Sequence, residues 1–167
     1  MTAGEIEVRP AKQDEYAAVG DLAVEAYLAD GLVRHEYLPT LRDAAARAAA
    51  GELLVAVDAV TGDLLGTASL FTTAAGPDWA EGASPDDAVL RMLAVSPEAR
   101  RRGVARALTL ECIRRAHEMG LRRLILSTAP AMTAAHALYE QLGFRREPAA
   151  DWEPVPGLTL LAYWLPL

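Results

Sequence analysis

Three consecutive arginines, Arg100–Arg102, and a glycine, Gly103, stand between an apolar run and an amphipathic run of the chain. The apolar run, 88–95, predicts a strand, and the periodic run, 104–119, predicts a helix. The first N–H groups of a helix have no partner within the helix, and the aligned peptide dipoles place positive potential there. A glycine lets the backbone approach a ligand closely. This junction is therefore predicted to bind an anion, most often a phosphate.

Two common phosphate motifs do not fit this loop. A P-loop places Lys and then Ser or Thr after its last glycine, whereas Val104 and Ala105 follow Gly103. A dinucleotide fold has Gly-x-Gly-x-x-Gly after its first strand, but this loop has one glycine and lies late in the chain. Nucleic-acid binding is disfavoured by the net charge of −7 and by the lack of a basic stretch with stacking aromatic residues.

The elements that position the loop follow from apolar periodicity and turn residues. Strands are predicted at 6–9, 53–57, 64–71, 88–95, 124–127, 144–146 and 158–165, and helices at 13–30, 40–50, 104–119 and 132–142. The strand–helix–strand unit over 88–127 implies a parallel pair, and the hairpins on either side imply antiparallel pairs. We therefore expect a single α/β (α+β) domain over 1–167, with a mixed sheet and helices on both faces. The long stretch 72–87 is typical of a functional or mobile loop.

Three motifs, in this order and at this spacing, resemble signatures of the GNAT superfamily of N-acetyltransferases. They are the strand ending Leu93-Ala-Val-Ser, the loop Arg100-x-x-Gly-x-Ala and the segment Ala135-His-Ala-Leu-Tyr-Glu-Gln-Leu-Gly-Phe. The resemblance covers nearly the whole chain and is firmest over 88–147. It implies a GNAT-like, mostly antiparallel sheet in which the parallel fourth and fifth strands splay apart.

The resemblance also implies transfer of an acetyl group from acetyl-CoA, by direct attack, to a primary amine of a small molecule or a peptide N-terminus. The CoA pyrophosphate would lie on backbone N–H groups of Arg101–Arg106, and the arginine side chains would add charge-assisted contacts. The pantetheine arm would pair with the end of the fourth strand. The cofactor-binding residues implied are Leu93, Ala94, Val95, Arg100, Arg101, Arg102, Gly103, Val104, Ala105, Arg106 and Thr128. No metal is implied.

The chemistry requires a neutral amine, and an unperturbed alkylamine is neutral at pH 7 in only about one molecule per few thousand. The resemblance makes Tyr139 the catalytic acid beside the CoA sulfur; alternatively, Tyr139 is a core aromatic of its helix. Many family members carry a glutamate on the fourth strand, where this chain has Val89. The remaining candidates for the base are Asp86, Asp87, Glu81, His35 and an ordered water.

Met132 is a second departure from the family, whose members commonly carry a cofactor-contacting Asn there. Methionine cannot make that hydrogen bond, so Thr128 or Thr133 is expected to supply it. The acceptor is predicted to lie between the first two helices and residues 72–87, with Tyr27, Tyr37 and Trp79 as candidate lining residues. Residues 1–90 carry a net charge of −11 and residues 91–167 a net charge of +4, so the acidic half would favour a cationic amine.

The single cysteine, Cys112, allows no internal disulfide and is expected in the core, which fits the cytoplasm. The beginning of the chain lacks a signal-peptide pattern, and no apolar run is long enough for a membrane span. A homodimer is a candidate assembly, because family members often pair and the tail Leu158–Leu167 is apolar. Two other functions stay open: an acyl-CoA sensor without catalysis, suggested by Val89 and Met132, and a polyanion-binding protein that uses the arginines.

Overall fold

The computed structural model describes residues 5–31 and 34–167, so part of the N-terminal stretch discussed above lies outside it. The described residues form two compact units. Unit 1 comprises the described residues up to Leu70 together with Met92–Cys112, and unit 2 comprises Phe71–Arg91 and Ile113–Leu167. A single domain over 1–167 stays a prediction.

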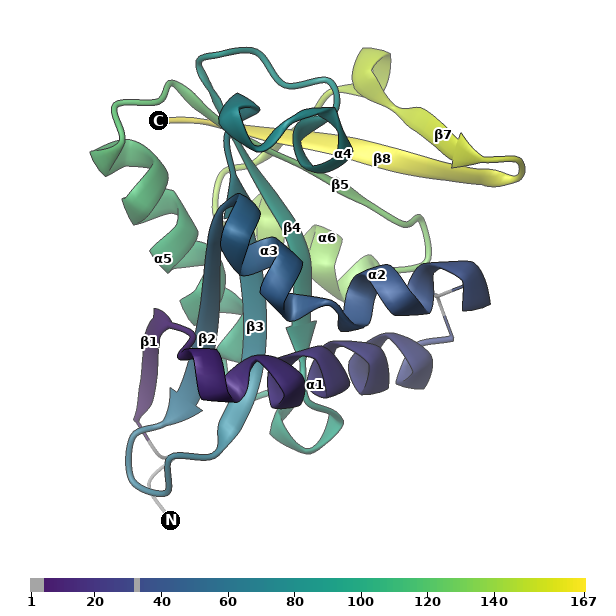
Figure 1. Ribbon diagram of the computed structural model, residues 1–167. Helices are drawn as coiled ribbons and strands as arrows, with labels where there is room; N and C mark the ends of the chain where they lie inside the picture. The colour runs from purple at the N-terminus through teal and green to yellow at the C-terminus, as the bar shows by residue number, and fades with distance from the viewer. Residues whose placement is uncertain (1–4, 32–33) are drawn as a thin grey trace. The chain divides into compact units, whose positions relative to one another are not determined.

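The secondary structure follows the predicted order closely (Figure 1). The strands are β1 (Ile6–Pro10), β2 (Glu52–Asp58), β3 (Leu64–Phe71), β4 (Asp87–Val95), β5 (Arg123–Thr128), β6 (Arg145–Arg146), β7 (Trp152–Val155) and β8 (Leu158–Pro166). The helices are α1 (Tyr16–Ala29), α2 (Leu38–Arg42), α3 (Ala44–Ala50), α4 (Pro77–Ala80), α5 (Val104–Glu118) and α6 (Thr133–Gln141). Strand β4 and helix α5 contribute residues to both units.

The strands hydrogen-bond in the order β1-β2-β3-β4-β5-β8-β6, and β7 pairs with β8. The β4–β5 pair is parallel, while the pairs β1–β2, β2–β3, β5–β8, β6–β8 and β7–β8 are antiparallel. The β4–β5 ladder runs from Asp87 opposite Arg123 to Val89 opposite Ile125, although both strands continue beyond it. Met92 in β4 has a φ of 54°, a left-handed conformation outside regular strand geometry. The predicted mixed sheet, mostly antiparallel with one parallel pair, is confirmed.

Unit 1 has helices on both faces of its strands, as predicted. A buried cluster joins α1 and α3 to one face of β2; it consists of Val19, Ala44, Leu53, Val55 and Val57. In Figure 1, α1 and α3 lie in front of β2 and β3. The other face meets α5, because a Cβ on Gly66 of β3 would come within 2.8 Å of a Val104 methyl carbon. This close approach places the start of α5 directly against β3.

Three local features differ from the sequence prediction. The second helix is divided at Asp43, whose carboxylate accepts from the Ala46 N–H at 3.1 Å and so begins α3. The stretch 72–87 contains the 3₁₀ turn Thr73–Ala75 and α4 rather than a plain loop. Strand β7 lies in a segment expected to be irregular, because its pairing with β8 outweighs an exposed and proline-containing sequence.

Candidate functional site

The arginine loop, residues 96–103, joins β4 to α5. It begins against the sheet, where the Ser96 N–H donates to the Leu65 carbonyl oxygen at 2.8 Å. Arg101 and Gly103 both adopt left-handed conformations, with φ of 64° and 82°. That conformation costs a residue with a side chain about 1–2 kcal/mol. The surroundings of Arg101 must therefore hold it in place.

The backbone of the arginine loop alternates in the sign of φ. The φ angle is positive at Arg101, not at Arg102, and positive again at Gly103. Such alternation turns successive N–H groups toward one side, and the helix beginning at Val104 adds further N–H groups without intrahelical partners. A Cβ on Gly103 would meet nothing within 4 Å, so the space above this glycine is open. Binding of the CoA pyrophosphate by this loop stays a prediction.

Two of the three arginines are engaged by carboxylates of unit 1. Arg100 pairs with Asp30, just after α1, at 2.6 Å, and Arg102 pairs with Asp58, at the end of β2, at 3.0 Å. Asp58 also accepts from the N–H groups of Val60 and Thr61. These two backbone hydrogen bonds, followed by the Arg102 contact, lower the pKa of Asp58. The Asp58 carboxylate is therefore charged at neutral pH.

Sequence reasoning missed Asp30 and Asp58, since they lie 70 and 44 residues before their arginine partners. No local pattern signals a contact at that separation. Arg101 and Arg106 are exposed. Of the cofactor-binding residues predicted on β4, Ala94 is buried while Leu93 and Val95 are half-buried. All the residues predicted to contact the CoA pyrophosphate and pantetheine from β4 and the loop lie together in unit 1.

Tyr139 lies on α6 in unit 2 and is 5% exposed. Its ring contacts Phe144 and Tyr163, with centroids 5.4 Å and 5.9 Å away. This packing fixes the ring, as either a core aromatic or a positioned acid requires. Its catalytic role stays a prediction.

Thr128 ends β5 in unit 2, and its hydroxyl is a buried polar group that the cofactor prediction would explain. Among the residues that the structure describes, Thr128 Oγ1 has no hydrogen-bond partner. A buried hydroxyl without a partner costs about 1–3 kcal/mol, so a ligand group that reached it would relieve that cost. Met132 precedes α6 and makes no side-chain cap, as expected of a side chain without an oxygen to accept from the first N–H groups of the helix.

The Asp87 carboxylate, at the start of β4, is held by an arginine and by a backbone N–H. Asp87 is fully buried and accepts two bonds from the Arg123 guanidinium, at 2.8 and 2.9 Å, and one from the Ser84 N–H. Burial alone would raise the pKa of Asp87, but the bonds from Arg123 and Ser84 outweigh it and lower that pKa. A general base works best when its pKa lies near the operating pH, which for a carboxylate means a raised pKa. The Asp87 carboxylate is thus engaged in a buried ion pair, and Val89, two residues further on, is a buried, non-titrating residue. The identity of the base stays a prediction.

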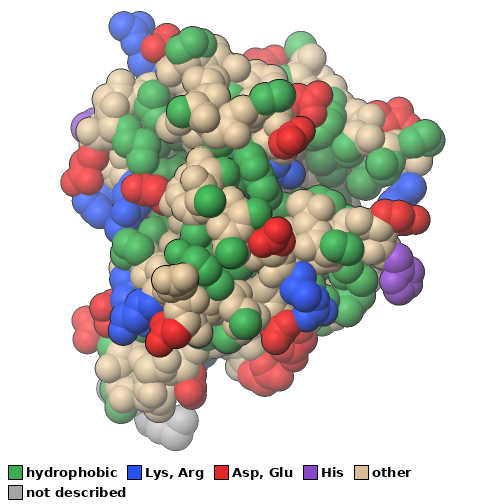
Figure 2. All heavy atoms as spheres, viewed as in Figure 1, with side chains coloured by type: hydrophobic (Ala, Val, Ile, Leu, Met, Phe, Trp, Pro, Cys, Tyr) green, Lys and Arg blue, Asp and Glu red, His purple; other side chains and the backbone are tan. Residues whose placement is uncertain are grey.

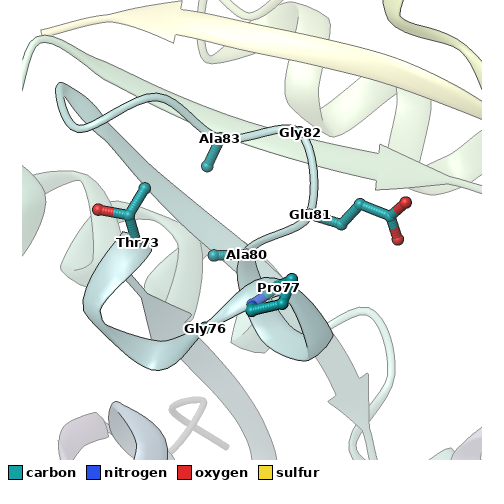
Figure 3. Close-up of a pocket in the computed structure, with 7 residues that line it drawn as sticks. All are labelled: Thr73, Gly76, Pro77, Ala80, Glu81, Gly82 and Ala83. Carbon is teal, nitrogen blue, oxygen red and sulfur yellow. The ribbon is translucent and has the colours of Figure 1, made fainter.

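The segment 73–83 forms a hollow of about 290 Å³ in unit 2, drawn in Figure 3. Its lining residues are Thr73, Gly76, Pro77, Ala80, Glu81, Gly82 and Ala83. In Figure 3 the Glu81 carboxylate extends away from the other lining residues, so it does not face into the hollow. The hollow is therefore lined mainly by small and apolar groups.

Trp79 of α4 is held by its neighbours in unit 2. Its ring stacks on Phe71 at 5.0 Å, and the Arg91 guanidinium lies 5.6 Å from the ring centre. Arg91 also donates to the Asp78 carbonyl oxygen at 2.8 Å. Trp79 is half-buried by these contacts, whereas the other aromatics predicted to line the acceptor pocket, Tyr27 and Tyr37, belong to unit 1.

Among the residues that the structure describes, the face shown in Figure 2 has no extended basic patch of the kind that a polyanion-binding surface needs. On the face shown in Figure 2, acidic and basic side chains are interspersed.

Within residues 5–31 and 34–167, no group of three or more His, Cys, Asp or Glu side chains could hold a metal ion. No helix in the same described part of the chain is long and apolar enough to cross a membrane.

Comparison with known proteins decides the family. The sequence model of the Acetyltransferase (GNAT) family matches residues 16–144, about three quarters of the chain. The chain belongs to the GNAT acetyltransferase family. This GNAT chain is also similar to human N-acetylaspartate synthetase, with 36% identity over 80 residues, which are 47% of the chain and 26% of that protein. It is similar to mycothiol acetyltransferase of Thermobispora bispora, with 42% identity over 67 residues, 40% of the chain and 23% of that protein.

The GNAT chain thus matches about a quarter of the length of these curated relatives. Among solved structures, it resembles a protein from Salmonella typhimurium described as an acetyltransferase and solved with its cofactor acetyl-CoA. The TM-score is 0.69 at 21% identity, over 98% of this chain and 94% of the other. At that identity the likeness establishes the shared fold.

Proposed function

We propose that this GNAT chain is an N-acetyltransferase that moves the acetyl group of acetyl-CoA to a primary amine by direct attack. The observation that carries the proposal is the arginine loop, which is left-handed at Arg101 and Gly103 and opens α5 in a chain of this family. The Salmonella protein of the same fold binds acetyl-CoA, which supports the choice of donor. The pyrophosphate would be held by Arg101–Arg106, and the pantetheine amides by the backbone of Leu93–Val95.

In the proposed reaction the amine nitrogen bonds to the thioester carbon, the carbon–sulfur bond breaks and CoA leaves. A thiol with a pKa of about 8.5 leaves readily even as the thiolate. A proton from the Tyr139 hydroxyl to the departing sulfur would assist this step. The amine loses one proton to water and the Tyr139 phenolate regains one from water, so the products are the amide and the CoA thiol.

The missing carboxylate on β4 bears on the choice of acceptor. Val89 cannot accept a proton, and Asp87 is paired with Arg123. With no free carboxylate at these two positions of β4, an amine that is partly neutral by itself is the better acceptor. An α-amino group, with a pKa of about 7.7–8.0, is neutral at pH 7 in roughly one molecule in ten, far more often than an alkylamine. The proposal therefore favours the α-amino group of a peptide or of a small molecule.

The test is the release of CoA thiol from acetyl-CoA in the presence of a panel of amines at pH 7. The panel pairs short peptides with free N-termini against the same peptides blocked at the N-terminus and carrying a lysine. We expect turnover with the free α-amino group and little with the lysine. Tight binding of acetyl-CoA without turnover of any amine would favour the second candidate, an acyl-CoA sensor, which the buried Val89 and the paired Asp87 make worth testing.

Two broader expectations belong to the same proposal. The only cysteine of the sequence, Cys112, is buried and has no second cysteine in the chain to form a disulfide with, which supports a protein of the reducing cytoplasm. A homodimer through the apolar strand β8 is the proposed assembly. Light scattering of the purified chain would distinguish it from a monomer.

A further inference from the structure

Two carboxylates hold the arginine loop on either side of Arg101. The Arg100 guanidinium donates to both carboxylate oxygens of Asp30, at 2.6 and 3.3 Å. The Arg102 guanidinium donates to Asp58 at 3.0 Å. The Asp58 carboxylate is itself held by the N–H groups of Val60 and Thr61, which also donate to it. The two carboxylates come from different elements of unit 1, so the loop is anchored to α1 and to the β2–β3 turn together.

This anchoring explains how an arginine can occupy a strained backbone conformation at the centre of the loop. A left-handed arginine persists only where its neighbours leave no alternative. The pairs at Arg100 and Arg102 restrain the residues immediately before and after Arg101, whose own φ is 64°. Loss of either pair would let Arg101 relax, and the N–H groups of the loop would no longer converge.

We propose that Asp58 and Asp30 are positioning residues for the donor: they hold the arginine loop in the shape that binds the CoA pyrophosphate. The inference rests on the proposed function. Neither carboxylate touches the donor, and each acts through its arginine. In this proposal Arg100 and Arg102 anchor the loop to Asp30 and Asp58. The pyrophosphate is bound by backbone N–H groups and by the exposed side chains of Arg101 and Arg106.

Positioning and simple electrostatics predict opposite effects of removing the Asp58 charge. If Asp58 only neutralised Arg102, its replacement by Asn would free a positive charge and strengthen the binding of a diphosphate. If Asp58 positions the loop, the same change weakens binding despite the more favourable net charge. Asn is a suitable replacement, because its side-chain oxygen can still accept from the Val60 and Thr61 N–H groups.

The experiment is a calorimetric titration of Asp58→Asn with coenzyme A and, separately, with pantetheine, which lacks the pyrophosphate. We expect the dissociation constant for coenzyme A to rise roughly 5-fold, the equivalent of losing a well-formed surface ion pair. Affinity for pantetheine should not change. Asp63→Asn is the matched control, because Asp63 lies on the same turn, is exposed and carries the same charge. It should bind coenzyme A at least as tightly as the wild type.

A double-mutant cycle separates positioning from a general loss of structure. In an Arg102→Gln background, Asp58→Asn should have little further effect on coenzyme A binding, because the pair is already broken. Equal losses for coenzyme A and pantetheine would indicate general unfolding and overturn the inference. Unchanged or tighter binding of coenzyme A by Asp58→Asn would overturn it too, while leaving the proposed function intact. Failure of the wild type to bind coenzyme A would instead remove the proposed function and the inference with it.

The Asp30 pair provides an independent repeat of the test. Asp30→Asn should weaken coenzyme A binding in the same direction, and Arg100→Gln should abolish that effect. Glu25→Gln, at an exposed position of α1, is its control and should leave the affinity unchanged or slightly increased. Because Asp30 is more exposed than Asp58, we expect the smaller change at Asp30.

Discussion

Arg100, Arg101 and Arg102 stand side by side in the chain but contact different partners. The outer two are paired with carboxylates, and the central one is exposed on a left-handed backbone. The three adjacent positive charges predict an anion site. Which of the three side chains are engaged within the protein depends on Asp30 and Asp58. Phosphate contacts by all three side chains were expected. The pairs favour Arg101 for that role.

Tyr139 offers the sharpest test of catalysis at a single residue. Tyr139→Phe removes only the hydroxyl, so the ring can still pack against Phe144 and Tyr163. If the hydroxyl is the acid, kcat for acetyl transfer should fall by about 10²–10⁴ while the affinity for acetyl-CoA is kept. Steady-state kinetics beside a binding titration would measure both.

Tyr163→Phe is the matched control for Tyr139→Phe. Tyr163 is a buried tyrosine of the same aromatic cluster, and burial raises the pKa of its hydroxyl. No catalytic role was predicted for it. Its replacement should leave kcat within a few-fold of the wild type. A similar small effect of both substitutions would rule out Tyr139 as the acid.

At the scale of elements, the position of α5, the helix that follows the arginine loop, depends on a glycine in β3. Gly66 in β3 lets the Ala94 carbonyl and the Val104 side chain approach so closely that a Cβ would lie 2.8 Å from each. Gly66→Ala should therefore lower the free energy of unfolding by about 1–3 kcal/mol through overpacking. Because the contact involves the first residue of α5, coenzyme A should also bind more weakly.

Ser69, three residues further along β3, gives the opposite expectation. Its hydroxyl is buried, and among the described residues it has no hydrogen-bond partner. Ser69→Ala should be neutral or stabilising, since it removes an unsatisfied polar group. Chemical denaturation of both variants would check the pair, and equal stability of Gly66→Ala and the wild type would contradict the close contact.

At the scale of the whole molecule, stability should depend on carboxylates that are paired in the folded state. Arg9 lowers the pKa of Glu15 to about 2, and Arg146 lowers that of Asp151 to about 2. Arg123 and Ser84 lower the pKa of Asp87 despite its burial. A folded-state pKa below the unfolded one contributes stability above the unfolded value, near pH 4, and that contribution disappears as the pH falls toward 2.

The chain should therefore lose stability progressively between about pH 5 and pH 2. In Glu15→Gln the melting temperature should be lower than in the wild type at pH 7, and the gap should close toward pH 2. Glu7→Gln, at an exposed position of β1, should follow the wild-type profile. Thermal melts across this range would measure the difference, and a gap that stayed constant down to pH 2 would argue against the Arg9–Glu15 pair.

The order of helices and strands could be predicted because apolar periodicity and turn residues are local properties of the chain. The predicted strand 88–95 and helix 104–119 correspond closely to β4 and α5. The break at Asp43 and the strand β7 were not predicted, because a side-chain cap and a partner strand overrode weak local preferences. The family motifs also predicted acetyl-CoA as the acetyl donor. They could do so because the motifs and the spacing between the arginine loop and the Tyr139 helix are properties of the sequence alone.

The sequence by itself determined the class of fold, the family and the loop that begins α5. Only the tertiary structure decided which charged side chains are paired with one another, in that loop and elsewhere. It paired Arg100 with Asp30, Arg102 with Asp58 and Arg123 with Asp87, each across more than 30 residues of chain. The physical reason is that an ion pair depends on the distance between two groups in space, and the separation of residues along the chain does not set that distance.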